Sequence, residues 1–471
     1  MSMFDFGYDD FDDSAREARL SDLVENYEES DPSAYFDSDA LEEIAGYYFD
    51  DGRFEDALAV IDRLLEQHPS SSDGWMRRGV VLNNMGRHEE AMEAYDRALD
   101  INPMDTESLV NRGITLDSLG DAEAALEAYE DALAINPLHS EALFNQGVTL
   151  ERANRLEDAV VAFERCADLQ PQHPEVWYEL GYCHDRLGHN EDSVNCYDQH
   201  LDGTPYSQDA WYNRGIVLNR MGRFEDAVES YEMALAIQDD FASAHYNLGN
   251  ALANMGKLEA SIESYERVLD LEGRDAATFY NIALAYEELE DYATARRHYK
   301  KALDEELEYP EAWYGLGCSY EAEGYHEHAL ECFDHALELT PGTPKFWKAR
   351  ADAAYNAHRL SAALDAYETA IDLDETNRQT WLDYAEALFE ARRLEEALGA
   401  YRKAISLEPD NASTYFRQAK ALLALGRSDE TIRSLKKAFD LDPGKRREFQ
   451  QVYPDLYRNA HVRRLLGLDR S

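Results

Sequence analysis

The chain has 471 residues, of which 96 are Asp or Glu and 45 are Lys or Arg, so its formal net charge is −51. This excess of carboxylates excludes electrostatic binding to bare DNA, RNA or an anionic membrane surface. No apolar stretch approaches the ~18 residues of a membrane-spanning helix, and the first residues do not form an export signal, so we expect a cytoplasmic protein without membrane insertion.

Two origins explain the acidity equally well. In a halophilic cytoplasm, carboxylates hold water and salt screens their mutual repulsion. An arginine-biased genome combined with ordinary solubility gives the same composition, including the absence of lysine before Lys257. The five cysteines form no CxxC pair, and their odd number argues against a disulfide framework.

The start of the chain differs from the remainder. Residues 1–13 alternate aromatic and acidic side chains, which predicts a disordered acidic-aromatic arm. Ser14 and Glu17 then form a capping-box pattern, and apolar residues follow at helical spacing. We therefore expect residues 14–37 to form an N-terminal capping helix.

From Ser38 to Lys445 the sequence repeats every 34 residues, twelve times, without insertion or deletion. All six tryptophans stand at position 4 of a repeat, position 8 is glycine or alanine, and position 24 is mostly aromatic. Position 15 is often glycine, where a helix ends and the chain turns, and most repeats have proline at position 32. Each repeat is therefore predicted to form a helix, a tight turn and a second helix.

This pattern resembles the tetratricopeptide repeat family, whose signature residues in one repeat are matched by Trp211, Gly215, Leu218, Ala227 and Tyr231. The resemblance covers residues 38–445. It implies an all-α fold, a right-handed α-solenoid superhelix of about twelve helix-turn-helix units with terminal capping helices. One unit cannot bury its apolar face alone, so neighbours must stack, and residues 446–471 are expected to cap the C-terminal end.

The first helix of each repeat also has a polar face, because positions 2, 6, 9 and 13 lie about 200° around the helix from positions 4, 8 and 11. Position 6 supplies a column of asparagines: Asn111, Asn145, Asn213, Asn247 and Asn281. Position 5 supplies a column of tyrosines: Tyr178, Tyr212, Tyr246, Tyr280 and Tyr314. Asparagine both donates and accepts hydrogen bonds, and tyrosine offers rigid contact area, so we predict a peptide-binding groove here. The resemblance implies the same concave groove, whereas the alternative is that each asparagine bonds a neighbouring helix.

Position 13 carries arginine in three successive repeats, namely Arg152, Arg186 and Arg220. Arginine forms bidentate bonds to carboxylate and phosphate, so these residues suit an acidic ligand, including the arm of residues 1–13. The alternative is ion pairing between adjacent repeats, because position 12 supplies acidic partners there: Asp117, Glu151 and Asp185.

Motifs of catalysis and metal binding give no positive indication. His328, Cys332 and His335 share one face of a predicted helix, but they lack a fourth ligand, so we expect no metal there. The sequence contains no phosphate loop, Gly-x-Ser-x-Gly or His-Glu-x-x-His motif, so we expect neither an enzyme nor a cofactor.

We predict an interaction scaffold or adaptor that binds an extended or acidic peptide segment of another protein. The alternative is a regulatory or accessory subunit that docks partners by its convex or terminal surfaces.

Overall fold

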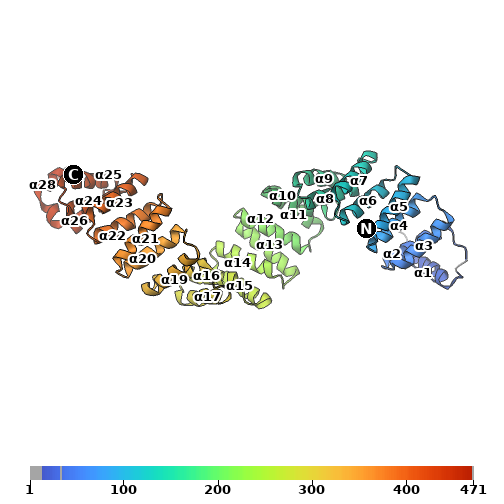
Figure 1. The fold of residues 1–471 in the computed structure, drawn as a ribbon, viewed down its shortest axis with the longest axis horizontal. Coiled ribbons are helices and arrows are strands. Elements are labelled where there is room, and N and C mark those ends of the chain that lie inside the picture. Colours follow the sequence, from blue (N-terminus) through green and yellow to red (C-terminus); the bar gives the residue numbers. More distant parts are fainter. Residues whose placement is uncertain (1–12, 32–33, 469–471) are drawn as a thin grey trace. The chain divides into compact units, whose positions relative to one another are not determined.

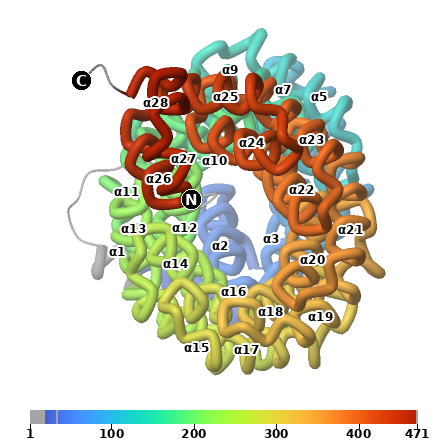
Figure 2. The backbone as a smooth tube through the Cα atoms, turned by 90° about the vertical axis from the view of Figure 1, so that its left-hand side faces the viewer, coloured from blue at the N-terminus to red at the C-terminus, as the bar shows by residue number. Residues whose placement is uncertain are grey.

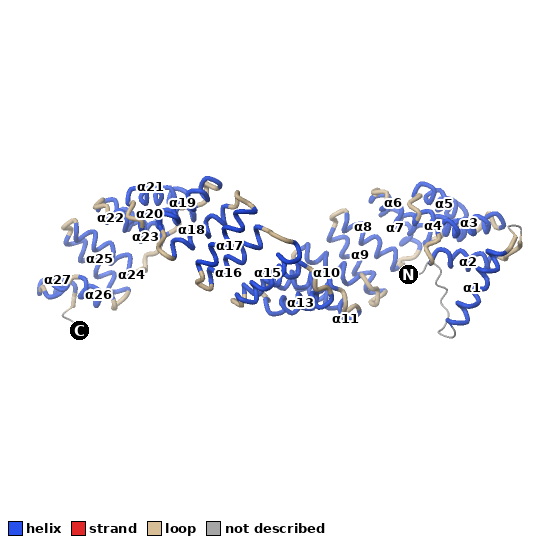
Figure 3. The backbone as a smooth tube through the Cα atoms, turned by 90° about the horizontal axis from the view of Figure 1, so that it is seen from below, coloured by secondary structure: helices blue, strands red, loops and turns tan. Residues whose placement is uncertain are grey.

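The computed structural model describes residues 13–31 and 34–468, and the side chains from residue 19 onward. Residues 1–12 of the predicted arm, and the side chains of the predicted capping box at Ser14 and Glu17, lie outside this description. Every regular element of the described residues is a helix, and short loops join consecutive helices (Figures 1 and 3). Within the same residues, no helix is long and apolar enough to cross a bilayer. The predicted all-α class is confirmed.

The chain divides into two compact units, Met1–Asp239 and Asp240–Ser471. In the N-terminal unit a single helix precedes paired helices, and the elements in order are α1 (Asp13–Glu29), α2 (Ser38–Asp50), α3 (Phe54–Gln67), α4 (Ser72–Asn84), α5 (His88–Ile101), α6 (Thr106–Ser118), α7 (Ala122–Ile135), α8 (Ser140–Arg152), α9 (Leu156–Leu169), α10 (Val176–Leu187), α11 (Asn190–Gly203), α12 (Gln208–Arg220) and α13 (Phe224–Ile237).

The C-terminal unit continues the pairs and ends in three short helices. Its elements are α14 (Ala242–Asn254), α15 (Leu258–Glu272), α16 (Ala276–Glu288), α17 (Tyr292–Glu305), α18 (Pro310–Ala322), α19 (His326–Leu339), α20 (Pro344–Asn356), α21 (Leu360–Leu373), α22 (Arg378–Glu390), α23 (Leu394–Leu407), α24 (Ala412–Ala424), α25 (Ser428–Leu441), α26 (Lys445–Val452), α27 (Pro454–Arg458) and α28 (Ala460–Leu466). Each 34-residue repeat thus supplies one even-numbered first helix and one odd-numbered second helix.

The turn inside a repeat uses the left-handed backbone conformation at position 15. Gly222 has φ of 75°, as the glycine at this position predicts. Four repeats without glycine adopt the same conformation with φ between 58° and 60°, at Asn154, Glu290, His358 and Arg392. Tertiary packing therefore imposes the turn even where the local residue disfavours it.

The two helices of a repeat pack closely where position 8 meets position 24. A Cβ added to Gly215 would lie 2.6 Å from Tyr231 Cε1, and one added to Gly147 would lie 2.5 Å from Phe163 Cε1. Tyr231 is only 1 % exposed. The two helices therefore approach closely at position 8, because these glycines leave room for an aromatic ring rather than for a side chain of their own.

Each tryptophan connects its own repeat to the preceding one. All six indole Nε1 atoms donate to the backbone carbonyl six residues earlier, at position 32 of the preceding repeat. Trp211 reaches the Pro205 carbonyl at 3.0 Å, and Trp381 reaches the Glu375 carbonyl at the same distance. The bond therefore forms whether or not the preceding repeat closes with proline.

Within each unit the first helices of successive repeats contact one another directly, as α4, α6, α8, α10 and α12 do in the N-terminal unit. In the C-terminal unit α16, α18, α20 and α22 form the same series. Figure 2 shows α16, α18, α20 and α22 on the inner side of the curve of that unit, with α17, α19 and α21 on its outer side. The first helices therefore line the inner surface of the unit.

Both ends of the repeat array are covered by packed helices. Val24 of α1 is buried against Leu41 and its neighbours in the first repeat. At the other end, Phe449 and Leu466 are buried against the last repeat. Val452 and Leu465 of the same capping segment remain 46 % and 41 % exposed. All five cysteines are free thiols, and only Cys318 is not fully buried.

Candidate functional site

The predicted asparagines lie on the first helices and are partly buried. In α6 and α8 they bond their own helix, since Asn111 Nδ2 donates to the Glu107 carbonyl and Asn145 Nδ2 to the Glu141 carbonyl, both at 2.9 Å. These two amides do not join neighbouring repeats.

Two later asparagines bond the preceding repeat instead. Asn213 Nδ2 donates to the hydroxyl of Tyr178 at 3.0 Å, and Asn281 Nδ2 donates to the hydroxyl of Tyr246 at 2.9 Å. Asn247 is partly buried on α14. The tyrosine of one repeat therefore orients the asparagine of the next, which realises the neighbouring-helix alternative for these pairs. Because an amide has two N–H donors and one acceptor, it retains hydrogen-bonding capacity after this bond.

The tyrosine column packs against the aromatic residues of position 24. The ring centroids of Tyr178 and Tyr197 are 5.8 Å apart, and Tyr246 and Tyr265 have the same separation. The remaining members of the column make the same contact at 5.7 to 6.1 Å, through the pairs Tyr212–Tyr231, Tyr280–Tyr299 and Tyr314–Phe333. Each ring is therefore held in place by the second helix of its own repeat.

The three arginines do not form one cationic wall. Arg152 pairs with Asp117 of the preceding repeat at 2.5 Å, and Arg220 pairs with Asp185 at 2.6 Å. These are the ion pairs between repeats that the acids of position 12 allow. Arg186 differs, because it donates to Asn154 Oδ1 and to the Tyr182 hydroxyl and not to Glu151.

Glu151 instead faces another carboxyl group. Glu179, which stands where the asparagine column is interrupted, is hydrogen-bonded to Glu151 of the preceding repeat. Burial, followed by this bond and the charge of Glu151, raises the pKa of Glu179 from 4.5 to about 8. The pair therefore holds a proton near neutral pH.

The helical trio considered for metal binding is not assembled as a site. Cys332 is 5 % exposed and packs in the core, whereas His328 stacks on Tyr320 and His335 lies on Trp313. The three side chains serve packing in separate places.

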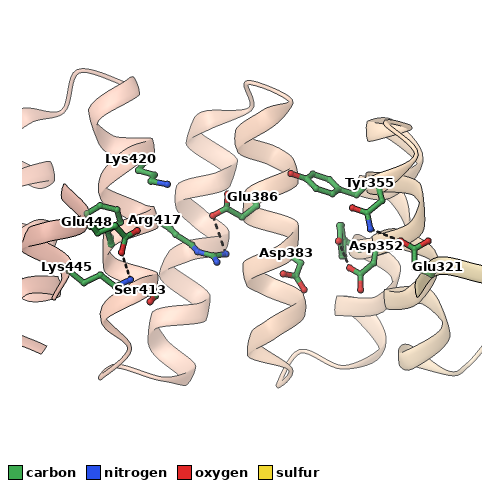
Figure 4. Close-up of a pocket in the computed structure, with 13 residues that line it drawn as sticks. Glu321, Asp352, Tyr355, Asp383, Glu386, Ser413, Arg417, Lys420, Lys445 and Glu448 are labelled. Carbon is green, nitrogen blue, oxygen red and sulfur yellow. Dashed lines mark hydrogen bonds and ion pairs between the residues drawn. The ribbon is translucent and has the colours of Figure 1, made fainter. Parts of the chain in front are cut away.

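A cavity of about 680 Å³ lies on the inner surface of the C-terminal unit and contains none of the predicted site residues. Its lining comes from α18, α20, α21, α22, α24 and α26: Glu321, Asp352, Tyr355, Asn356, Tyr367, Asp383, Glu386, Ser413, Phe416, Arg417, Lys420, Lys445 and Glu448. This volume lies within the ~300–1,000 Å³ of typical ligand pockets. Figure 4 shows these side chains, carried by separate parallel helices, around one open space.

Charge changes sign along this cavity. Asp352, Asp383 and Glu386 supply carboxylates at one side, and Arg417, Lys420 and Lys445 supply cations at the other, where Glu448 also lies (Figure 4).

Several of these charges are already paired. Arg417 lies 3.4 Å from Glu386, and Lys445 lies 2.6 Å from Glu448. Within the described residues Lys420 has no ion pair, and its Nζ lies 5.7 Å from the centroid of the Phe416 ring. Lys420 is therefore the cation of this cavity most available to a ligand.

Hydrogen bonds and ion pairs from neighbouring side chains stabilise the acidic side of this cavity. Tyr367 donates its hydroxyl hydrogen to Asp352 at 2.6 Å, and Tyr401 donates to Glu386 at 3.0 Å. Lys348 lies between Asp352 and Asp383, at 2.6 and 3.1 Å. Burial raises the pKa of Asp352 in spite of these partners.

The residues of this cavity stand at the polar positions of the first helices, but in repeats outside the predicted asparagine and tyrosine columns. Asp383 and Arg417 stand at position 6, and Glu386 and Lys420 stand at position 9. A column defined by asparagine at position 6 does not contain them. The available signal was the change from acidic to basic residues at these two positions between consecutive repeats.

Comparison with known sequences identifies the repeats. Models described as "Tetratricopeptide repeat" or "TPR repeat" match both units, at residues 43–105, 110–174, 154–207, 217–256, 240–304, 310–343, 385–426 and 412–445. No curated protein sequence matches the chain.

Among solved structures, the chain is similar to MamA, with 23 % identity over 36 % of this chain and 92 % of MamA, at a TM-score of 0.35. It is also similar to YrrB, described as a TPR protein with an unusual peptide-binding site, with 20 % identity over 38 % of this chain and 93 % of YrrB, at a TM-score of 0.37. Yeast Tom70 is 16 % identical over 92 % of this chain and 99 % of Tom70, at a TM-score of 0.39.

Proposed function

The chain belongs to the tetratricopeptide repeat family, and we propose that it is a non-catalytic interaction scaffold. Its first helices bind an extended segment of a partner protein, because stacked repeats present a continuous inner surface built from side chains of successive helices. The partner is a protein and not a nucleic acid, since a net charge of −51 repels phosphates.

The observation that carries this proposal is the cavity of about 680 Å³ across α18 to α26. It is lined by charges of both signs, in the order acidic then basic along the repeats. A segment with a basic side chain at one end and an acidic side chain or carboxylate at the other complements it. Lys420 is the residue that we assign to the ligand's negative group, because it lacks an ion-pair partner among the described residues.

The asparagine and tyrosine columns add to the proposed surface within each unit, Asn281 in the C-terminal unit and Asn213 in the N-terminal unit. Asn213 and Asn281 are each oriented by a tyrosine hydroxyl, so their amides meet a ligand backbone without first having to be ordered. Arg186, bonded to Asn154 and Tyr182 instead of a carboxylate, is the arginine of the position 13 series that we assign to acidic ligands.

The test is selection from a displayed library of short random peptides on the full-length chain, followed by affinity measurement of the selected peptides by fluorescence anisotropy. We expect Lys420→Glu to weaken binding about tenfold or more, because a matched charge becomes a repulsive one. The matched control is Lys437→Glu, which makes the same change on an exposed residue of α25 in the same repeat. Peptides whose affinity is insensitive to Lys420, Asn213 and Asn281 alike would contradict the proposal.

A second candidate function, docking of a partner on outer helices, is favoured by the composition of α17. This second helix carries Arg296, Arg297, Lys300 and Lys301 in an otherwise acidic chain, and Arg297 and Lys300 are exposed. Loss of partner binding in Arg297→Glu, with binding retained in Lys420→Glu, supports this alternative.

A further inference from the structure

Three potential metal ligands converge at the turn between α10 and α11. His184 lies in the last turn of α10, His189 is the residue before α11, and Asp192 lies in the first turn of α11. The Nδ1 atoms of the two imidazoles are 3.4 Å apart, and the ligand atoms of all three residues lie within 4.8 Å of one another. This group is independent of the inner surface and of the trio in α19.

The backbone of the turn fixes this arrangement. Gly188 adopts φ of 77°, and the His189 N–H donates to the His184 carbonyl at 2.9 Å. The imidazole of His189 makes no capping bond to α11. The chain therefore brings the two histidines together and leaves the ring of His189 without a role in ending or starting a helix.

The other repeats show what these positions hold when no such cluster forms. Position 11 is most often leucine, as at Leu218, which is 0 % exposed. Position 16 is most often arginine, which pairs with the acid of position 19, as Arg223 does with Asp226 at 2.7 Å. In this repeat both positions are histidine, and within the described residues Asp192 has no lysine or arginine partner.

The simultaneous change at two positions has a chemical consequence. Histidine at position 11 gives up the apolar burial of leucine, and histidine at position 16 gives up the ion pair of arginine. What the pair gains is two imidazole nitrogens that face each other beside a carboxylate. In a tetrahedral ion with metal–nitrogen bonds of ~2.0–2.1 Å, two nitrogen ligands are about 3.3 Å apart, which the 3.4 Å separation matches.

We propose that His184, His189 and Asp192 bind a divalent transition-metal ion of the zinc class. Two imidazoles and one carboxylate select Zn²⁺, Co²⁺ or Ni²⁺ over Mg²⁺ and Ca²⁺, which prefer oxygen ligands only. Both histidines bind as neutral rings through Nδ1, with their protons on Nε2. The bound ion ties the end of α10 to the start of α11, and one coordination position stays open.

The experiment is a Co²⁺ titration of the full-length chain in excess Mg²⁺, so that Mg²⁺ occupies the many oxygen-only sites of this acidic protein. Two variants restore the residues usual in other repeats, His184→Leu and His189→Arg, and both are compatible with the fold for that reason. The control is His335→Ala, which removes an exposed histidine of α19 outside the cluster.

We expect the wild-type chain and His335→Ala to take up one equivalent of Co²⁺ with the visible absorption of a four-coordinate ion. In the two restoring variants the affinity should fall at least about tenfold, since loss of a direct ligand exceeds the 10–100-fold cost of losing an outer partner. Zn²⁺ should also slow amide exchange in α10 and α11 of the wild-type chain and of His335→Ala, but not in the two restoring variants. Equal Co²⁺ binding by wild type, His184→Leu and His189→Arg, or absorption of a six-coordinate ion only, overturns the proposal.

Discussion

The side-chain amide of Asn213 donates to the hydroxyl of Tyr178 at 3.0 Å, which joins the first helices of two consecutive repeats across 35 residues of sequence. Asn281 and Tyr246 make the same bond, with the same sequence separation, in the C-terminal unit. The bond orients an amide on the inner surface and stabilises the stacking of repeats. Stability and the proposed ligand binding therefore depend on the same side chains.

Removing the acceptor of this bond should lower stability. In Tyr178→Phe the Asn213 amide loses its partner, and we expect the free energy of unfolding to fall by about 1 kcal/mol. Chemical denaturation measures this change, and the double variant with Asn213→Ala gives the coupling between the two residues. Tyr206→Phe is the control, because Tyr206 is 83 % exposed and should not change stability. Equal stability of Tyr178→Phe and wild type would show that the bond contributes nothing.

Gly215 at position 8 leaves room for a buried aromatic ring, whereas a glycine on an exposed helix surface has no such role in packing. Gly215→Ala places a methyl group 2.6 Å from the ring of Tyr231, so we expect a loss of about 1–3 kcal/mol in the free energy of unfolding. Gly399→Ala, in the middle of α23 with no heavy atom within 4 Å of the added Cβ, should instead stabilise by about 1 kcal/mol. Thermal denaturation of the two variants distinguishes crowding from helix propensity, and a common sign would contradict this account.

The left-handed turns without glycine predict a stabilising substitution. Arg392 has φ of 60°, a conformation that costs a residue with a Cβ about 1–2 kcal/mol. Glycine avoids this cost, but its greater backbone freedom in the unfolded state offsets part of the gain. We therefore expect Arg392→Gly to raise the free energy of unfolding by about 0.5–1 kcal/mol. The reverse change at an equivalent turn, Gly222→Arg, should lower it. A destabilised Arg392→Gly variant would mean that the arginine side chain makes contacts that outweigh the backbone strain.

The Glu179–Glu151 pair predicts a specific dependence of stability on pH. Because the folded-state pKa of Glu179 is raised from 4.5 to about 8, the protonated carboxyl stabilises the fold fully below pH 4.5, and this contribution is lost as pH rises through 8. Glu179→Gln keeps a neutral group at every pH. Its free energy of unfolding relative to wild type should therefore increase between pH 5 and pH 9, by about 1 kcal/mol or more.

The same comparison has an internal check. Burial is the largest cause of the raised pKa of Glu179 and persists in Glu151→Gln, but this variant removes the charge that adds to it, so the pH dependence should become smaller. Denaturation curves recorded at each pH for the three proteins supply the measurement. A difference between variant and wild type that stays constant from pH 5 to pH 9 would exclude a shared proton at this position.

Much of the fold follows from residues that recur every 34 positions. Gly215 and Tyr231 are recognisable as a small residue and a large one, and the structure confirms that one packs on the other. The face of the helix that carries Asn213 was likewise predictable from helical spacing. Sequence alone did not reveal the acceptor of its amide, because that depends on the rotamer of Tyr178 and on the distance between repeats.

Other features escaped prediction because they arise only when repeats are stacked. The left-handed conformation of Arg392 was not foreseen, since a local preference for glycine does not tell where tertiary packing overrides it. The pairing of Arg152 with Asp117 remained one of two alternatives until the distance was known. The sequence did not predict that the imidazoles of His184 and His189 lie close together, because their spacing of five residues matches neither helical periodicity nor a common metal motif.

The sequence by itself determined the class of fold, the number of repeats and the side chains that face inward or outward. The reason is that repeats of constant length form helices of constant length, which pack in the same way each time. Only the tertiary structure decided which charges meet. Asp383, Arg417 and Lys420 lie on two of the six helices that line one cavity, and His184 meets His189 through the geometry of a single turn. Periodicity specifies the face on which a side chain lies, whereas hydrogen bonding, ion pairing and metal binding depend on differences of an ångström between side chains on different helices.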